Sequence, residues 1–225
     1  ADDAMEPDRL TDLLALATKH GWNAVADDQY RIADWTAGAP RRRLWSDDDF
    51  GTIELTLDRF VRENIMTYAG FGRELGYIKP LIKKDFLTTH RLSYDEDMRL
   101  GEDYDLYARM LNCDCRFGLV DPQGYLAFDT PGSLSRAHRS EALEKLVRSD
   151  QRLLSAIPDN HALNSIIVEH MRLNQKKVAW AKIGEAYHER DLVKALSSFA
   201  APPEVVGDLL TKLFQLSGRK LGLTS

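Results

Sequence analysis

The sequence predicts an α/β domain over residues 1–138, followed by an all-helical extension over residues 139–225. The spacing of apolar residues supports this division. Strand-like and helical apolar patterns alternate along the first part, whereas every periodic stretch beyond about Arg139 has helical spacing. An apolar fraction of 44% is ordinary for a globular protein and allows a substantial core.

The α/β part is expected to begin with a helix. Pro7 suits the first helical position, where its missing N–H is not needed, and leucines then recur at helical spacing until Gly21. Residues 22–32 are strand-like, and residues 37–43, which contain Gly and Pro and end in three arginines, are expected to form a solvated loop. A second helix is expected over residues 52–70.

Glycines at positions 70, 72 and 76 then indicate a loop. A short helix is expected over residues 104–111, followed by two brief strands over residues 117–120 and 125–128. In the extension, prolines at positions 158, 202 and 203 mark the joints between helical stretches. These stretches cover residues 143–153, 166–183, 192–199 and 205–216.

Composition excludes some classes of function. The net charge is −5 with both signs scattered along the chain, so nucleic acid is not an expected partner. Cys113 and Cys115 are too few and too close to staple a fold, and no second Cys/His pair accompanies them at zinc-ligand spacing. No apolar run approaches the ~20 residues that cross a bilayer. We expect a cytoplasmic protein, at most peripheral to a membrane.

Three groups of polar residues can carry chemistry. The first is the pair Asp2 and Asp3, whose carboxylate oxygens suit a hard divalent cation. An acidic helix start, favoured by the helix dipole, explains this pair equally well.

The second group is Glu102 and Asp103, at the expected N-terminus of a helix. There the free N–H groups and the dipole favour the ionised form, and an ionised carboxylate can remove the proton of an attacking hydroxyl. The third group is a turn whose polar side chains can bind diphosphate oxygens, with a histidine that can ligate a metal. It consists of Ser133, Ser135, Arg136 and His138. A capped helix and a plain polar turn are the respective alternatives.

The order of these groups resembles that of family 2 glycosyltransferases of the GT-A fold, and among them the bacterial enzymes that build exopolysaccharide of the succinoglycan type. Ala1-Asp2-Asp3 matches the tail of the family's Leu-Asp-x-Asp-Asp strand-end motif, and Glu102-Asp103 matches its Glu-Asp base motif. The segment Gly76-Tyr77-Ile78-Lys79-Pro80-Leu81 and the Gly-Ser-Leu-Ser-Arg loop are also similar to the family's. The resemblance covers about residues 1–155.

The resemblance implies an inverting, metal-dependent transfer from a nucleotide-sugar, expected to be a UDP-sugar, to a growing, lipid-linked exopolysaccharide. Asp2 would coordinate Mg²⁺ or Mn²⁺ at the donor diphosphate, Asp3 would support that site, and His138 is a further candidate ligand. Asp103 would be the general base, and Glu102 would orient it or touch the acceptor sugar.

Further roles follow from the same resemblance. Ser133, Ser135 and Arg136 would lie near the diphosphate, and Tyr77 and Lys79 would belong to the wall that binds the acceptor. About one hundred N-terminal residues that the family uses for its first βαβ units and its nucleotide-base pocket have no counterpart here. We therefore expect the C-terminal portion of a GT-A, Rossmann-like domain, inactive on its own.

The extension suggests two alternatives. Trp180, Tyr187 and Phe199 lie at positions similar to the tetratricopeptide signature, which would make the protein a helical interaction scaffold without catalysis. Only one copy is visible, so a single hairpin packed on the catalytic domain is favoured. Residues 209–221 combine an apolar face with basic residues and could lie on an anionic membrane, although a core-facing helix is the simpler explanation.

Overall fold

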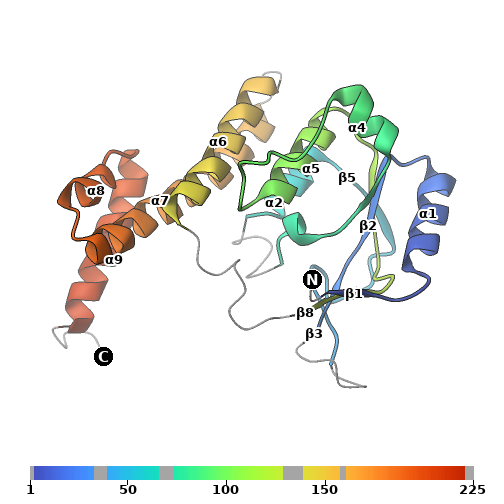
Figure 1. Ribbon diagram of the computed structural model, residues 1–225, viewed down its shortest axis with the longest axis horizontal. Helices are drawn as coiled ribbons and strands as arrows, with labels where there is room; N and C mark the ends of the chain where they lie inside the picture. Colours follow the sequence, from blue (N-terminus) through green and yellow to red (C-terminus); the bar gives the residue numbers. More distant parts are fainter. Residues whose placement is uncertain (1–2, 33–39, 66–72, 129–138, 158–160, 221–225) are drawn as a thin grey trace.

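The computed structural model describes residues 3–32, 40–65, 73–128, 139–157 and 161–220. These residues form a mixed α/β part followed by helices, which confirms the predicted fold class. Figure 1 shows the strands gathered in one half of the molecule, with α6 and α7 leading away from them to α8 and α9. The predicted boundary after residue 138 lies next to residues outside the described ranges and stays a prediction.

The described strands form two mixed sheets of four strands each. In each sheet the two inner strands are parallel and the outer strands pair antiparallel to them. The first sheet has the order β1 (Ala4–Met5), β8 (Tyr125–Phe128), β3 (Tyr30–Ile32) and β4 (Arg42–Arg43). The second has the order β5 (Thr52–Leu55), β7 (Phe117–Val120), β2 (Ala24–Asp27) and β6 (Leu81–Ile82).

The parallel pair β2 and β7 is the centre of the α/β part. Every residue of both strands is buried, as expected for strands that are covered on both faces. Because successive side chains alternate between faces, Val25 packs with Leu13 of α1 (Arg9–His20), whereas Ala24 and Ala26 join the main core on the other face. That core also contains α2 (Leu57–Arg62) and α5 (Glu102–Asn112).

Most predicted elements of the α/β part are confirmed. Helix α1 ends at Gly21, whose φ of 66° is the left-handed conformation that glycine adopts most easily. Strands β7 and β8 have the predicted bounds, and α5 includes the predicted helix. The short helix η1 (Leu75–Tyr77) and helix α4 (Lys84–His90) were not predicted.

Three predictions were wrong. The α/β part begins with strand β1, not with a helix, and Pro7 lies before the N-cap Asp8 instead of at the first position of α1. Residues 52–55 are strand β5, and the helix α2 begins only after Thr56, whose side chain accepts a hydrogen bond from the Arg59 N–H. An N-cap at this point separates the alternating Thr-Ile-Glu-Leu strand from the helical pattern that follows. Residues 42–43 are strand β4 on the edge of a sheet, not part of a loop, because β3 offers them an antiparallel partner.

The extension contains the predicted helices. They are α6 (Ser140–Ala156), α7 (His161–Glu189), α8 (Leu192–Ser197) and α9 (Pro203–Lys220). Side chains of α6 and the start of α7 belong to the main core, among them Leu146, Leu153 and Ile167. The far end of α7 instead forms a separate small core with α9 around Ala179 and Val205.

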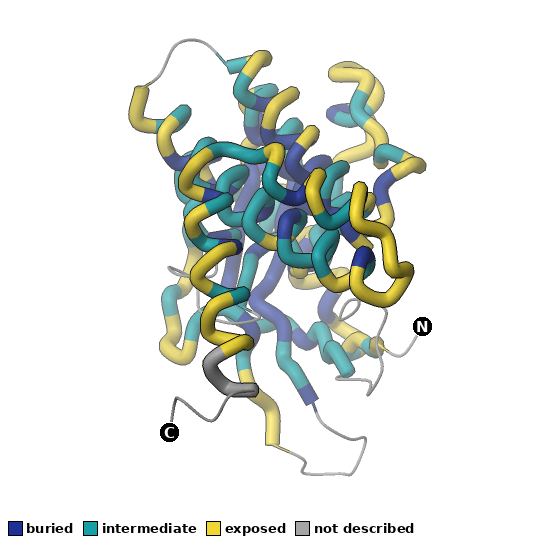
Figure 2. Tube along the Cα trace, turned by 90° about the vertical axis from the view of Figure 1, so that its left-hand side faces the viewer, coloured by how far each residue is buried: buried dark blue, intermediate teal, exposed yellow. Residues whose placement is uncertain are grey.

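The outer end of the extension exposes large apolar side chains. Val193 is 78% exposed and Phe214 is 80% exposed. Figure 2 shows exposed residues along the C-terminal helix, in contrast to the buried centre of the molecule. Within the described ranges, no helix combines the length and the apolar character needed to cross a membrane.

Candidate active site

The candidate base Asp103 lies in the first turn of α5. The helix is capped by Gly101, whose φ of 72° is left-handed and whose missing side chain makes room for Leu146 of α6. The rest of α5 is anchored by buried residues, including Leu106 and Met110. The packing of α5 against α6 therefore fixes the position of Asp103.

Three donors surround the Asp103 carboxylate. Lys79 Nζ lies 2.5 Å from Oδ2, and the Tyr94 hydroxyl donates to Oδ1 at 2.9 Å. The Tyr107 hydroxyl lies 3.3 Å from the same Oδ1. The Asp103 side chain is nevertheless 17% exposed. The carboxylate is thus held in a defined orientation while solvent and ligands can still reach it.

Both phenols near Asp103 stay neutral. Burial, followed by the negative charge of Asp103, raises the pKa of Tyr94 to about 12. The same two causes raise the pKa of Tyr107 well above its ordinary value. Both hydroxyls therefore keep their proton at physiological pH. Tyr94 donates its proton to Asp103, whereas the Tyr107 hydroxyl can donate either to Asp103 or to the Ile78 carbonyl, which is 3.2 Å away.

A cavity of about 390 Å³ opens beside Asp103. The structure brings together around it four residues that the sequence singled out, namely Tyr77, Lys79, Glu102 and Asp103. Residues that the sequence did not single out complete its lining. They are Asn64, Glu74, Gly76, Arg99, Leu100, Gly101, Tyr104, Leu143, Leu146, His170, Asn174 and Lys177.

The candidate metal residue Asp3 is linked to this region through Tyr125. The Tyr125 hydroxyl donates to Asp3 Oδ2 at 2.8 Å, and the Phe128 N–H donates to Asp3 Oδ1 at 3.1 Å. Burial and then Asp3 raise the pKa of Tyr125, and Asp103 is close enough to add to this effect. Asp3 and Asp103, which are far apart in sequence, thus lie near the same phenol.

Arg9 joins the two sides of the site. Its guanidinium lies 4.8 Å from the centre of the Tyr125 ring, and its Nη2 donates to the Lys79 carbonyl at 2.6 Å. The same group forms a buried ion pair with Asp27, at 2.7 Å from Oδ1. Arg9 therefore holds both the ring that contacts Asp3 and the backbone of the lysine that contacts Asp103.

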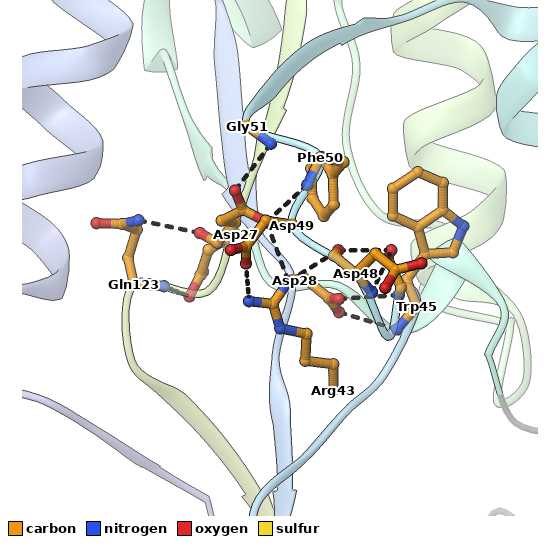
Figure 3. Close-up of polar contacts among 11 residues, drawn as sticks. Asp27, Asp28, Arg43, Trp45, Asp48, Asp49, Phe50, Gly51 and Gln123 are labelled. Carbon is orange, nitrogen blue, oxygen red and sulfur yellow. Dashed lines mark hydrogen bonds and ion pairs between the residues drawn. The ribbon is translucent and has the colours of Figure 1, made fainter.

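Sequence reasoning missed the pair Asp27 and Asp28 at the end of β2. Figure 3 shows their side chains pointing in different directions, Asp27 toward Gln123 and Asp28 toward the backbone of Trp45. Burial, only partly offset by backbone donors, raises the pKa of Asp28. Two acidic residues directly after a buried strand were the available signal, and their contacts connect β2 to the loops on either side.

The remaining predicted site residues lie outside the described residues. They are Asp2, Ser133, Ser135, Arg136 and His138. Among the described residues, no group of three or more His, Cys, Asp or Glu side chains could hold a metal ion. Both oxygens of Asp3 already accept hydrogen bonds. The described residues alone therefore do not form a metal site.

Comparison with known proteins gives two relatives in Rhizobium meliloti (strain 1021). The chain is 31% identical to the succinoglycan biosynthesis protein ExoU over 97% of its own length and 65% of that protein's. It is 27% identical to the succinoglycan biosynthesis protein ExoO, over 90% of its own length and 57% of that protein's. The chain thus spans about two thirds or less of these relatives. No protein-family model matches it.

A solved structure shares the fold. The crystal structure of S. aureus TarS 1-349 in complex with UDP-GlcNAc superposes with a TM-score of 0.51 at 13% identity, over 91% of this chain and 56% of that one. The resemblance to bacterial succinoglycan biosynthesis proteins that the sequence indicated is confirmed, and the solved structure shows the same fold.

Proposed function

We propose that the protein is an inverting glycosyltransferase that moves a hexose from a UDP-sugar to a growing, lipid-linked exopolysaccharide. The observation that carries this proposal is the position of Asp103, which lies beside a cavity and is oriented by Lys79, Tyr94 and Tyr107. The relationship to succinoglycan biosynthesis proteins supports the acceptor class. The UDP-GlcNAc bound by the structural neighbour TarS supports the donor class.

In this proposal Asp103 is the general base. An acceptor hydroxyl in the cavity donates its proton to the Asp103 carboxylate as its oxygen forms a bond to the anomeric carbon. The bond from that carbon to the donor diphosphate breaks on the opposite face, and the nucleotide diphosphate leaves with the bonding electrons. Lys79 and the two phenols hold the carboxylate for this transfer, and Glu102 and Tyr77 contact the acceptor sugar.

The donor side of the site rests on residues outside the described ranges. Mg²⁺ or Mn²⁺, held by Asp2 and His138 with support from Asp3, would offset the charge that builds on the leaving diphosphate. Ser133, Ser135 and Arg136 would bind the diphosphate oxygens. These assignments follow from the family resemblance.

The proposed location is the cytoplasm, with contact to the inner face of the membrane. Exposed apolar side chains at the outer end of the extension, such as Val193 and Phe214, support such a contact. A lipid-linked acceptor would then be presented to the cavity at the membrane surface.

The test uses the protein expressed from its full reading frame. Release of UDP from a panel of UDP-sugars is measured with Mn²⁺ and with a chelator, in the parent and in Asp103→Asn. Loss of the base is expected to lower turnover on the order of 10²-fold or more, with donor affinity nearly unchanged.

The matched control is Asp85→Asn, which neutralises an exposed aspartate in the first turn of α4. This variant is expected to retain parental turnover. A folded parent that releases no UDP from any donor would favour the alternative, a helical scaffold without catalysis. Equal turnover of Asp103→Asn and the parent would remove Asp103 from the role of base.

A further inference from the structure

The cavity beside Asp103 is walled on one side by the helical extension. His170, Asn174 and Lys177 of α7 line it, at a spacing of three to four residues that places them on one face of the helix. His170 is fixed by Asp150, whose Oδ2 lies 2.9 Å from its Nδ1, and Asn174 lies 3.3 Å from His170 Nε2. The extension therefore contributes an ordered wall to the site of the proposed reaction.

The cavity lining also contains an unsatisfied acceptor. Glu74, directly before η1, lines the cavity, and its Oε2 is buried without a hydrogen-bond partner among the described residues. A buried carboxylate oxygen without a donor is costly, and native proteins rarely leave one unpaired. A ligand hydroxyl in the cavity would supply this donor.

Lys177 faces the same space from α7. Its side chain is exposed and forms no hydrogen bond or ion pair within the described part of the chain. The surrounding walls still exclude enough water to lower the pKa of its ammonium, and the Glu74 carboxylate opposes this shift. Because Glu74 and Lys177 line the same cavity, one ligand in it can reach both, as acceptor and donor respectively.

The charges around the cavity favour a neutral ligand. Three acidic and three basic side chains line it, so neither sign prevails. They are Glu74, Glu102, Asp103, Lys79, Arg99 and Lys177. The half-exposed ring of Tyr77 adds an apolar surface beside these polar groups. The donors and acceptors suit the hydroxyls of a sugar, and the aromatic ring suits its ring carbons. The cavity volume of about 390 Å³ is near the lower end of the range for ligand pockets and suits a short saccharide.

We propose that Glu74 and Lys177 form a subsite for a neutral sugar unit of the acceptor, next to the unit whose hydroxyl reaches Asp103. This inference rests on the proposed transferase function. It assigns to the helical extension a direct part in acceptor recognition, because Lys177 and Asn174 both come from α7. Glu74 accepts from one hydroxyl of the sugar, and Lys177 donates to another.

The test measures binding and turnover separately. Binding of neutral disaccharides to the parent, Lys177→Met and Glu74→Gln is followed by nuclear magnetic resonance. The disaccharides are cellobiose, gentiobiose and laminaribiose. A disaccharide that contains glucuronic acid is the anionic comparison. The control Lys84→Met removes an exposed lysine of α4 outside the cavity lining.

At least one neutral disaccharide is expected to bind the parent and Lys84→Met with equal affinity. Its affinity for Lys177→Met and for Glu74→Gln is expected to be lower by about tenfold or more. Hydrolysis of the UDP-sugar by water is expected to be unchanged in Lys84→Met, whereas KM for the saccharide rises in Lys177→Met and Glu74→Gln. Three results would overturn the proposal. They are an unchanged saccharide affinity in the cavity variants, no binding of any neutral disaccharide to the parent, and a preference of the parent for the anionic disaccharide. Failure of the transferase assignment would appear instead as absent UDP-sugar turnover in the parent.

Discussion

The substitution Tyr104→Phe tests how the extension holds the base-bearing helix α5. The Tyr104 hydroxyl donates to Asp150 Oδ1 of α6 at 2.8 Å, and Asp150, which is fully buried, also contacts His170 of α7. This network connects α5, α6 and α7 at the wall of the cavity, which Tyr104 and His170 line. Burial, followed by the charge of Asp150, raises the pKa of Tyr104 well above its ordinary value, so its hydroxyl remains a donor.

The expected loss of stability follows from one hydrogen bond. Phenylalanine keeps the ring that stacks on Phe60 at a centroid distance of 5.6 Å, so no large cavity forms. The variant loses only a buried hydrogen bond to a charged acceptor, a contribution of about 1.5–3 kcal/mol. We expect the free energy of unfolding to fall by that amount.

Urea unfolding of the parent and the variant, followed by circular dichroism, measures this change. The matched control is Tyr187→Phe, which removes the hydroxyl of a tyrosine that is 76% exposed, and it is expected to change the free energy of unfolding by less than about 0.5 kcal/mol. A Tyr104→Phe variant whose midpoint and slope equal those of the parent would refute the role given to this network.

Two further substitutions test other polar contacts. Burial raises the pKa of Glu185, but hydrogen bonds from Lys194 and Ser140 outweigh this effect and lower the pKa from its ordinary value of 4.5 to about 2. The ionised carboxylate therefore stabilises the folded protein above pH 4.5, and this contribution is lost as the pH falls toward 2. Glu185→Gln should cost about 1–3 kcal/mol at pH 7, a difference that shrinks in urea melts between these two pH values. Arg9→Met leaves the buried Asp27 carboxylate without its cation and should lower the free energy of unfolding by about 3–5 kcal/mol. The double variant that adds Asp27→Asn should recover part of this loss. Thermal melts that show no recovery would contradict the expectation.

Local signals in the sequence determined most helices and the inner strands. Gly21 ends α1, and the apolar run of β7 needs no distant partner to be recognised. The motif Glu102-Asp103 likewise predicted an acidic helix start, because the free N–H groups of a helix favour carboxylates at that point. The error at residues 52–55 arose where strand and helix meet without a Gly or Pro between them.

Only the tertiary structure decided what surrounds the candidate base. Tyr107 lies one helical turn after Asp103, a proximity that helix spacing gives, but no spacing rule brings Lys79 or Tyr94 to this carboxylate. Glu74 and Lys177 meet at one cavity because α7 packs across α2 and α6, an arrangement fixed by the shape of the shared core. Local sequence specifies which segments are helices or strands, whereas long-range packing of their apolar faces specifies which polar side chains come together.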